Sequence, residues 1–223
     1  MQPKTAVVLG STGLTGQFLT QFLLNDITFT KVRILVRKPV SISHPKLEIE
    51  IVDFEKLADY RKKLGNGDCI FCCIGTTQRK VKGDKVLYRK IDVDIPVHAA
   101  QMGKDAGFKQ YLVVSAVGAN PRSANYYLKI KGDMEKEITA LQYDRFHVFR
   151  PSLVLGDRTE FRPLEIFAKN TMKVFDHLLF GKAKRYRSMQ AMDIARAMVA
   201  AAKNDAHGMF VHHYEDMMRL AAG

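Results

Sequence analysis

The chain has 223 residues, of which 47% are hydrophobic, and it carries a formal net charge of +12 at pH 7. This length is enough to bury the core of one large domain, and the apolar content excludes a disordered protein. No stretch reaches the roughly 20 apolar residues that cross a bilayer, and the amino terminus lacks the apolar segment of a secretory signal. We therefore expect a single domain over residues 1–223, without a membrane span, in the cytoplasm.

The positive charge is spread along the chain and is not gathered into a basic tail. Such a charge attracts polyanions, among them nucleic acids, anionic membranes and phosphate-bearing cofactors. The sequence contains no nucleic-acid motif and no Trp. Nucleic-acid binding is therefore not predicted, and the charge is compatible with attraction of a polyanionic cofactor.

The cysteines fall in one short segment, at Cys69, Cys72 and Cys73. The first two have the spacing of a redox motif, but the apolar neighbours Ile70 and Phe71 indicate a buried strand. Reactive thiols prefer a helix N-terminus and some exposure to solvent. No histidine or second cysteine pair stands at zinc-like spacing. We expect inert core thiols and no metal site.

Strand-like and helix-like patterns alternate from the amino terminus, which is typical of βαβ units and a parallel sheet. In chain order the pattern predicts a strand at 5–9, a helix from 14, strands at 32–36 and 47–52, a helix at 54–64, a strand at 69–74, a helix at 86–106 broken before Pro96, a strand at 111–115, a helix at 123–141, a strand at 146–149, helices at 163–179 and 192–203, and a short strand at 209–212. The predicted fold is a Rossmann-type, doubly wound α/β fold with a mainly parallel sheet. Residues 151–223 are expected to contribute a small C-terminal substrate cap over the carboxyl ends of the strands.

A glycine-rich segment follows the first predicted strand and comprises Gly10, Ser11, Thr12, Gly13, Leu14, Thr15 and Gly16. Between a strand and an amphipathic helix, this spacing is the fingerprint of dinucleotide binding. Gly10 permits the tight turn, Gly13 lets the pyrophosphate approach the backbone, and Gly16 lets the helix pack closely. The helix N-terminus then offers unpaired N–H groups to the phosphates.

The end of the second predicted strand carries Arg37 and Lys38. An enzyme that uses NAD commonly has an acidic residue there, about 20 residues after the glycines. A guanidinium can hold a phosphate at two points and can stack on adenine. We therefore predict NADP(H) as the cofactor, with an ordinary solvated basic turn as the alternative.

Two further strand ends are expected to line the same cleft. Asp53 and Phe54, after the third predicted strand, are candidates for contact with adenine. The segment after the fourth predicted strand is expected to let the backbone approach the ribose. It comprises Cys73, Ile74, Gly75, Thr76 and Thr77.

Ser115 ends the fifth predicted strand, and Tyr127 and Lys131 follow on a predicted helix, four residues apart on one face. This pattern resembles the catalytic centre of the short-chain dehydrogenase/reductase superfamily. In that superfamily the Tyr acts as acid or base, the Lys activates this Tyr and holds the nicotinamide ribose, and the Ser bonds the carbonyl oxygen. A structural pair on a helix surface is the alternative for Tyr127 and Lys131.

Additional segments narrow the resemblance to the atypical branch of this superfamily that is related to the human Tat-interacting protein. They lie in the same order along the chain, at residues 72–77, 92–94, 115–119, 127–132 and 149–158. The resemblance covers roughly residues 4–203 and implies a Rossmann domain that binds NADPH. It also implies that Asp92 replaces the usual catalytic Asn. The segment expected to lie along the nicotinamide comprises Pro151, Ser152, Leu153 and Val154.

The sequence as a whole favours an NADPH-dependent oxidoreductase that acts on a small carbonyl or hydroxyl substrate. Tyr127 would exchange the proton, Ser115 would orient the oxygen and Lys131 would anchor the ribose. A non-catalytic, NADPH-sensing protein that binds a regulatory protein partner shares the glycine loop, so the fold does not separate the two functions. A nucleotide-sugar epimerase ranks lower because the predicted cap is short. The helix with Tyr127 is rich in Lys and Glu, so we expect a monomer or a weak dimer.

Overall fold

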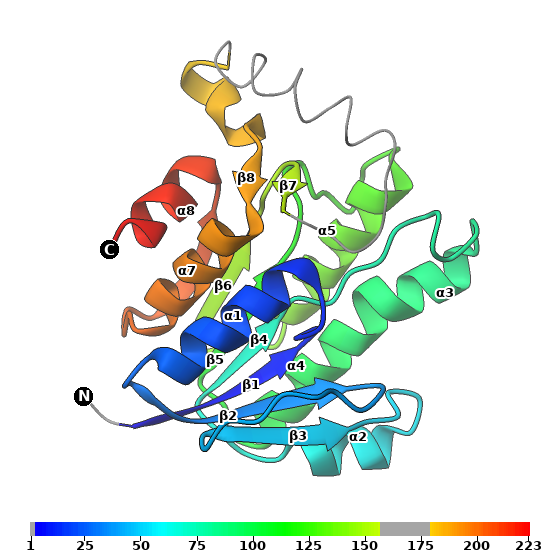
Figure 1. Cartoon of the computed structure of the whole chain (residues 1–223). Coiled ribbons are helices and arrows are strands. Elements are labelled where there is room, and N and C mark those ends of the chain that lie inside the picture. Colours follow the sequence, from blue (N-terminus) through cyan, green and yellow to red (C-terminus); the bar gives the residue numbers. More distant parts are fainter. Residues whose placement is uncertain (1–2, 157–178) are drawn as a thin grey trace.

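The structure is a computed structural model, which describes residues 3–156 and 179–223. Its centre is a parallel sheet with the strand order β3-β2-β1-β4-β5-β6-β9 (Figure 1). The strands are β1 (Lys4–Leu9), β2 (Phe29–Val36), β3 (Leu47–Ile51), β4 (Cys69–Cys72), β5 (Gln110–Val114), β6 (Arg145–Phe149) and β9 (Gly208–His212). The order reverses between β1 and β4, and ligands of such sheets bind at this point, outside the carboxyl ends of the strands. The predicted Rossmann fold is confirmed.

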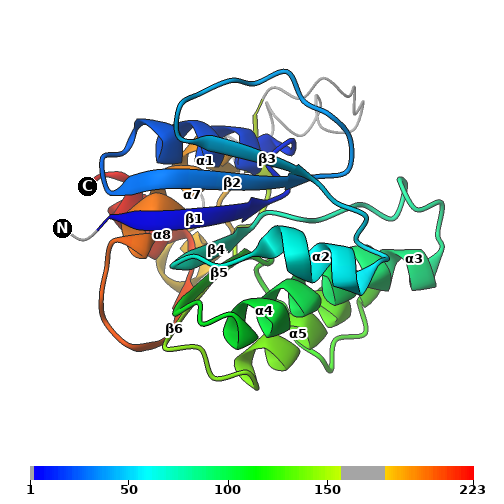
Figure 2. The same cartoon turned by 90° about the horizontal axis from the view of Figure 1, so that it is seen from below.

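Helices cover both faces of the sheet (Figures 1 and 2). One face is covered by α1 (Leu14–Asn25), α7 (Ala191–Ala202) and α8 (Tyr214–Ala221), and the other by α2 (Leu57–Leu64), α3 (Lys85–Arg89), α4 (Ile95–Asp105) and α5 (Tyr126–Thr139). Each face has its own apolar core. Val7 and Leu9 of β1 point into one core, while Ala6 and Val8 point into the other. Burial on both faces explains why this strand is an uninterrupted apolar run.

The carboxyl-terminal third contributes more to the sheet and its cover than predicted. β9 pairs in parallel with β6, and α7 packs against α1. The buried side of α7 includes Ala195, Ala197 and Ala201, whose small side chains let the neighbouring elements approach closely. These two elements therefore complete the Rossmann layers and do not form a cap over the strand ends.

The remaining described elements of this third are small. The strands β7 (Val154–Leu155) and β8 (Met189–Gln190) form a separate parallel pair, and a 3₁₀-helix spans Gly181–Tyr186. They lie beyond the carboxyl ends of the strands in Figure 1. The predicted helix at 163–179 falls almost entirely outside the described residues. Helix α8 was not predicted.

The predicted break before Pro96 is a local change of helix type. Residues Lys90–Asp94 form a π-helical turn between α3 and α4, in which the N–H of Ile95 donates to the Lys90 carbonyl. Proline has no N–H, and in a regular α-helix its ring would clash with the carbonyl four residues earlier, which belongs to Asp92. The wider turn relieves that clash, and π-turns of this kind are frequent at functional sites.

Among residues 3–156 and 179–223, none of the helices is both long enough and apolar enough to cross a membrane.

Candidate active site

The glycine loop between β1 and α1 leaves no room for a side chain at Gly10 or at Gly16. Gly10 has φ +79°, and a Cβ at this position would lie 2.8 Å from the carbonyl group of Cys73. A Cβ on Gly16 would lie only 2.0 Å from the Gly10 carbonyl oxygen. The first turn of α1 therefore rests directly on the loop, which is the close packing that the sequence predicts for these glycines.

The amino-terminal end of α1 is suited to an anion. Gly13 is the N-cap residue without a side-chain cap, and the first turn contains no acidic residue. The first N–H groups of a helix have no partner inside the helix, and its dipole favours a negative charge there. In the same loop, Ser11 Oγ is buried and has no hydrogen-bond partner among the described residues. These features fit the pyrophosphate of a nicotinamide dinucleotide, which the loop backbone and Ser11 would hold.

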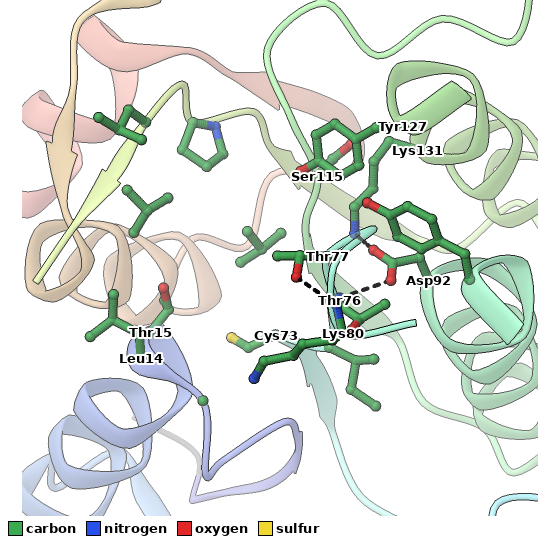
Figure 3. A pocket seen from close by; sticks show the side chains of 18 of the residues that line it. Leu14, Thr15, Cys73, Thr76, Thr77, Lys80, Asp92, Ser115, Tyr127 and Lys131 are labelled. Atoms are coloured by element: carbon green, nitrogen blue, oxygen red, sulfur yellow. Dashed lines mark hydrogen bonds and ion pairs between the residues drawn. The ribbon is translucent and has the colours of Figure 1, made fainter. Parts of the chain in front are cut away.

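A cavity of about 600 Å³ lies at the carboxyl ends of β1, β4 and β5. It brings together most of the predicted cofactor residues. These are Thr12, Gly13, Leu14, Thr15, Cys73, Ile74, Gly75, Thr76, Thr77, Pro151, Ser152, Leu153 and Val154. The predicted catalytic residues Asp92, Ser115, Tyr127 and Lys131 line it as well (Figure 3). One ligand can therefore reach the end of the glycine loop and these four residues at the same time.

Asp92 and Lys131 form a buried ion pair in the wall of this cavity. Asp92 Oδ1 lies 2.9 Å from Lys131 Nζ, and the two side chains are 0% and 3% exposed. Asp92 Oδ2 accepts a hydrogen bond of 2.8 Å from the Thr76 N–H. Burial alone would lower the pKa of Lys131, but the charge of Asp92 holds this pKa above its ordinary value. Lys131 is thus a fixed cation at neutral pH.

Tyr127 precedes Lys131 by one turn of α5 and lies at the cavity (Figure 3). It is 37% exposed, and its ring stacks with that of Tyr88 at a centroid distance of 6.4 Å and an interplanar angle of 21°. Tyr88 also lines the cavity and was not predicted as a site residue. Its position four residues before Asp92, on a predicted helix, is the signal that would have found it.

Ser115 lines the cavity, but its hydroxyl bonds to a residue that the sequence analysis missed. Ser115 Oγ donates to Glu135 Oε1, and both residues are buried. Arg150 Nε donates to the same Glu135 oxygen at 3.0 Å, and a second Arg150 nitrogen pairs with Glu135 Oε2. Glu135 comes four residues after Lys131 on the predicted helix. This spacing indicates that the Glu135 side chain lies on the same face of the helix as Lys131.

Four more residues line the cavity without having been predicted, namely Gln17, Gln78, Lys80 and Val114.

The residues predicted for the adenosine half of the cofactor lie elsewhere. Arg37, Asp53 and Phe54 line a second cavity of about 640 Å³, at the carboxyl ends of β2 and β3. Lys90 contributes to the same cavity, and Lys38 is exposed. The three lysines of this lining are each paired with an acid of the same lining. Arg37 and the ring of Phe54 are therefore the groups there that suit a phosphate and an adenine.

The predicted burial of the cysteines is confirmed for Cys69 and Cys72, while Cys73 is partly exposed. Burial raises the pKa of the Cys69 thiol to about 12. Burial also raises the pKa of Cys72 and Cys73. A thiol with such a pKa is protonated at neutral pH, and it is the thiolate that reacts.

Comparison with known proteins decides the family. A family described as NAD(P)H-binding matches residues 10–205. The chain belongs to this family. The match begins at the first glycine of the loop and ends just after α7. A nicotinamide dinucleotide is therefore confirmed as the type of cofactor.

Two relatives confirm the resemblance that the motifs predicted. Protein HTATIP2 of Rattus norvegicus is 35% identical over 202 residues, which cover 89% of this chain and 81% of that protein. Protein FMP52-1, mitochondrial, of Scheffersomyces stipitis is 36% identical over 156 residues, which cover 69% of each.

The predicted cytoplasmic location is contradicted by relatives of the second kind. Protein FMP52 of Coccidioides immitis, 29% identical over 209 residues, also carries the word mitochondrial in its name. The prediction rested on composition and on the residues at the amino terminus. Composition reflects the folded core, and members of one family share this core in whichever compartment they occur. Composition therefore does not indicate the compartment.

Solved structures with the same fold include enzymes of nucleotide-sugar chemistry. The UDP-N-acetylglucosamine 4-epimerase from Methanobrevibacter ruminantium, in complex with UDP-N-acetylmuramic acid, has a TM-score of 0.72 and 19% identity, and covers 96% of this chain and 77% of its own. MoeE5, in complex with UDP-glucuronic acid and NAD, has a TM-score of 0.72 and 18% identity, and covers 93% and 75%. At such identities the likeness shows the fold alone.

Proposed function

We propose that the protein is an NADPH-dependent oxidoreductase that acts on a small carbonyl or hydroxyl substrate. The observation that carries this proposal is the shared cavity of the glycine loop and the Tyr127, Lys131 and Asp92 side chains. Its volume of about 600 Å³ lies within the roughly 300–1,000 Å³ of small-molecule sites.

The roles of the side chains follow from their positions. When bound, the nicotinamide supplies a hydride to the carbonyl carbon, or takes one from the alcohol carbon in the reverse direction. Tyr127 gives its phenolic proton to the carbonyl oxygen, so that hydride and proton together convert the carbonyl to an alcohol. Lys131 stabilises the negative charge that this transfer leaves on the phenol. Asp92 keeps Lys131 charged and in place.

Replacement of Tyr127 tests this role. The Tyr127→Phe variant should bind NADPH as the unchanged protein does and should lose NADPH consumption with a panel of small aldehydes and ketones. Tyr186→Phe, at an exposed tyrosine of the 3₁₀-helix, is the matched control and should retain consumption. Undiminished consumption by Tyr127→Phe would refute the assigned proton donor.

The preference for NADPH is supported by Arg37 at the second cavity. A side-by-side fluorescence titration should give a dissociation constant at least about tenfold lower for NADPH than for NADH, which corresponds to about 1.4 kcal/mol. Arg37→Ala should weaken NADPH binding and leave NADH binding nearly unchanged. Arg219→Ala, at an exposed residue of α8, is the control. Equal losses for both cofactors in Arg37→Ala would refute the assignment.

A second candidate function, an NADPH sensor that binds a protein partner, is favoured by an apolar groove of about 540 Å³ lined by Phe54, Leu57, Val86 and Tyr126. Val86 is 80% exposed there. Tight NADPH binding without turnover, together with a partner that is retained only when NADPH is present, would support the sensor over the enzyme.

A further inference from the structure

We infer that Ser115 offers only hydrogen-bond acceptors to the cavity, and that the substrate therefore carries a hydroxyl group on the carbon next to the reacting carbonyl. The inference rests on the proposed function, because it names the substrate class of the same site. It departs from the role that the superfamily resemblance implies for Ser115, which is to donate to the carbonyl oxygen.

One hydrogen lies between Ser115 Oγ and Glu135 Oε1. Arg150 places two donors on the Glu135 carboxylate, one of them at 3.0 Å, and a guanidinium is always charged in proteins. Glu135 paired in this way is an ionised carboxylate, which accepts hydrogen bonds and has none to donate. The hydrogen in the bond between Ser115 Oγ and Glu135 Oε1 must therefore come from Ser115.

The bond to Glu135 limits what Ser115 offers to a ligand. A serine hydroxyl has one hydrogen and two lone pairs, so Ser115 turns lone pairs toward the cavity. A bare carbonyl oxygen is also an acceptor, and two acceptors that face each other in a buried site each lack a partner. Tyr127 remains as the donor to the carbonyl oxygen. Ser115 is free to accept from a different group of the substrate.

The charges that line the cavity identify the group from which Ser115 accepts. Among the described residues of the lining, Asp92 is the one acid, and Lys131 already neutralises it. An ammonium group would find no unpaired carboxylate in this lining, so the donor that fits is a neutral hydroxyl. Tyr127 and Ser115 line the same cavity, so a hydroxyl beside the carbonyl can meet Ser115 while the carbonyl oxygen meets Tyr127. The substrate class is an α-hydroxycarbonyl compound, and its reduction product is a vicinal diol.

The test compares two esters that a nicotinamide does not reduce and that differ only in the α-hydroxyl, methyl mandelate and methyl phenylacetate. Calorimetric titration of the NADP⁺-loaded protein should show at least tenfold tighter binding of one mandelate enantiomer than of phenylacetate. In Ser115→Ala, which retains the Glu135–Arg150 pair, the two esters should bind within about twofold of each other, because the acceptor is gone. Equal binding to the unchanged protein, or a preference that survives Ser115→Ala, would overturn the inference.

A second variant tests the part played by Glu135. The double substitution Glu135→Met and Arg150→Met removes both charges together, so no unpaired buried charge remains. The Ser115 hydrogen is then released toward the cavity, and phenylacetate should gain affinity relative to mandelate. A preference unchanged from the parent protein would contradict the role of Glu135. Turnover is scored separately, as NADPH consumption with 2-hydroxyacetophenone, so an intact ester preference without consumption would count against the proposed oxidoreductase function alone.

Discussion

Replacing Asp92 by Asn removes one charge from the cavity wall and nearly preserves the shape of the side chain. The Asn oxygen can still accept the Thr76 N–H that bonds Asp92 at 2.8 Å. The substitution therefore isolates the effect of the lost charge on Lys131, which is buried. In the variant this ammonium has no counter-charge, so the full cost of removing it from water opposes folding.

The size of the effect follows from the burial of the pair. Breaking one partner of a buried ion pair costs about 3–5 kcal/mol. In a chain of this size 1 kcal/mol corresponds to about 2–4 °C in Tm, so Tm should fall by about 6–20 °C. Burial lowers the pKa of the unpaired Lys131 in the variant, so the loss is greatest at neutral pH and diminishes as alkaline pH discharges the amine.

In the unchanged protein, the contribution of Lys131 to stability changes with pH in the opposite direction. The folded-state pKa of Lys131 lies above its ordinary value of 10.5, so its stabilisation is complete below that pH. The stabilisation is lost only as the pH rises through the folded-state pKa. Alkaline pH should therefore destabilise the unchanged protein while it partly rescues Asp92→Asn, and thermal unfolding at neutral and alkaline pH measures both slopes.

An exposed ion pair between α3 and α5 supplies the control. Arg89 and Glu137 lie 2.8 Å apart, and both side chains are 41% exposed. Glu137→Gln should cost no more than about 1 kcal/mol, as exposed pairs do. If Asp92→Asn lowers Tm no more than Glu137→Gln, burial does not set the strength of the Asp92–Lys131 pair and the reasoning is refuted.

Two further predictions concern the glycine loop and the core. Gly16→Ala places a Cβ 2.0 Å from backbone and should abolish NADPH binding in a fluorescence titration, whereas Gly107→Ala, between α4 and β5, where a Cβ would meet no atom within 4 Å, should retain it. Burial lowers the pKa of His147 from 6.5 to about 3, so the unfolded chain binds an additional proton between these pH values. As the pH falls through that window, His147 should cost up to about 1.4 kcal/mol of stability per pH unit. Chemical denaturation should show a shallower acid slope for His147→Phe than for the unchanged protein.

The centre of the sheet was predictable because strands such as β1 and β4 are buried on both faces. Apolar runs such as residues 5–9 and 69–74 stand out from the polar, helix-period segments between them. The glycine loop was predictable for a related reason, since the conformation at Gly10 and the packing at Gly16 exclude every other residue. The four-residue spacing of Tyr127 and Lys131 fixed their common helix face in advance.

Contacts between distant segments were not predictable in the same way. Ser115 and Glu135 are 20 residues apart, and their bond depends on how α5 is seated against β5. The π-turn that carries Asp92 arises from Pro96, and the proline alone indicated a break without its form. Helix α8 was missed for a different reason, because Tyr214, Met217 and Ala221 give it an apolar face that a helical period could have revealed. The bond of Ser115 to Glu135 and the form of the π-turn are set by packing that no local pattern encodes.

The helix α5 carries both halves of the proposed chemistry on successive turns. Tyr127, Lys131 and Glu135 are four residues apart, and each of the two charged residues pairs with a different element, Lys131 with Asp92 of the π-turn and Glu135 with Arg150 after β6. The first pair acts on the proton donor and the second on the acceptor Ser115. Variants of the two pairs should therefore separate the two functions.

This separation can be measured on folded protein below the Tm of each variant. Asp92→Asn should lower kcat for 2-hydroxyacetophenone and leave the preference for the hydroxylated ester, because Ser115 keeps its partner Glu135. The double substitution Glu135→Met and Arg150→Met should lose that preference and retain the Asp92–Lys131 pair. Sites without shared partners usually give additive effects, so a combined variant should show both losses. If either variant alone changes both kcat and ester preference, the two ion pairs form one coupled unit, and the division of labour along α5 is wrong.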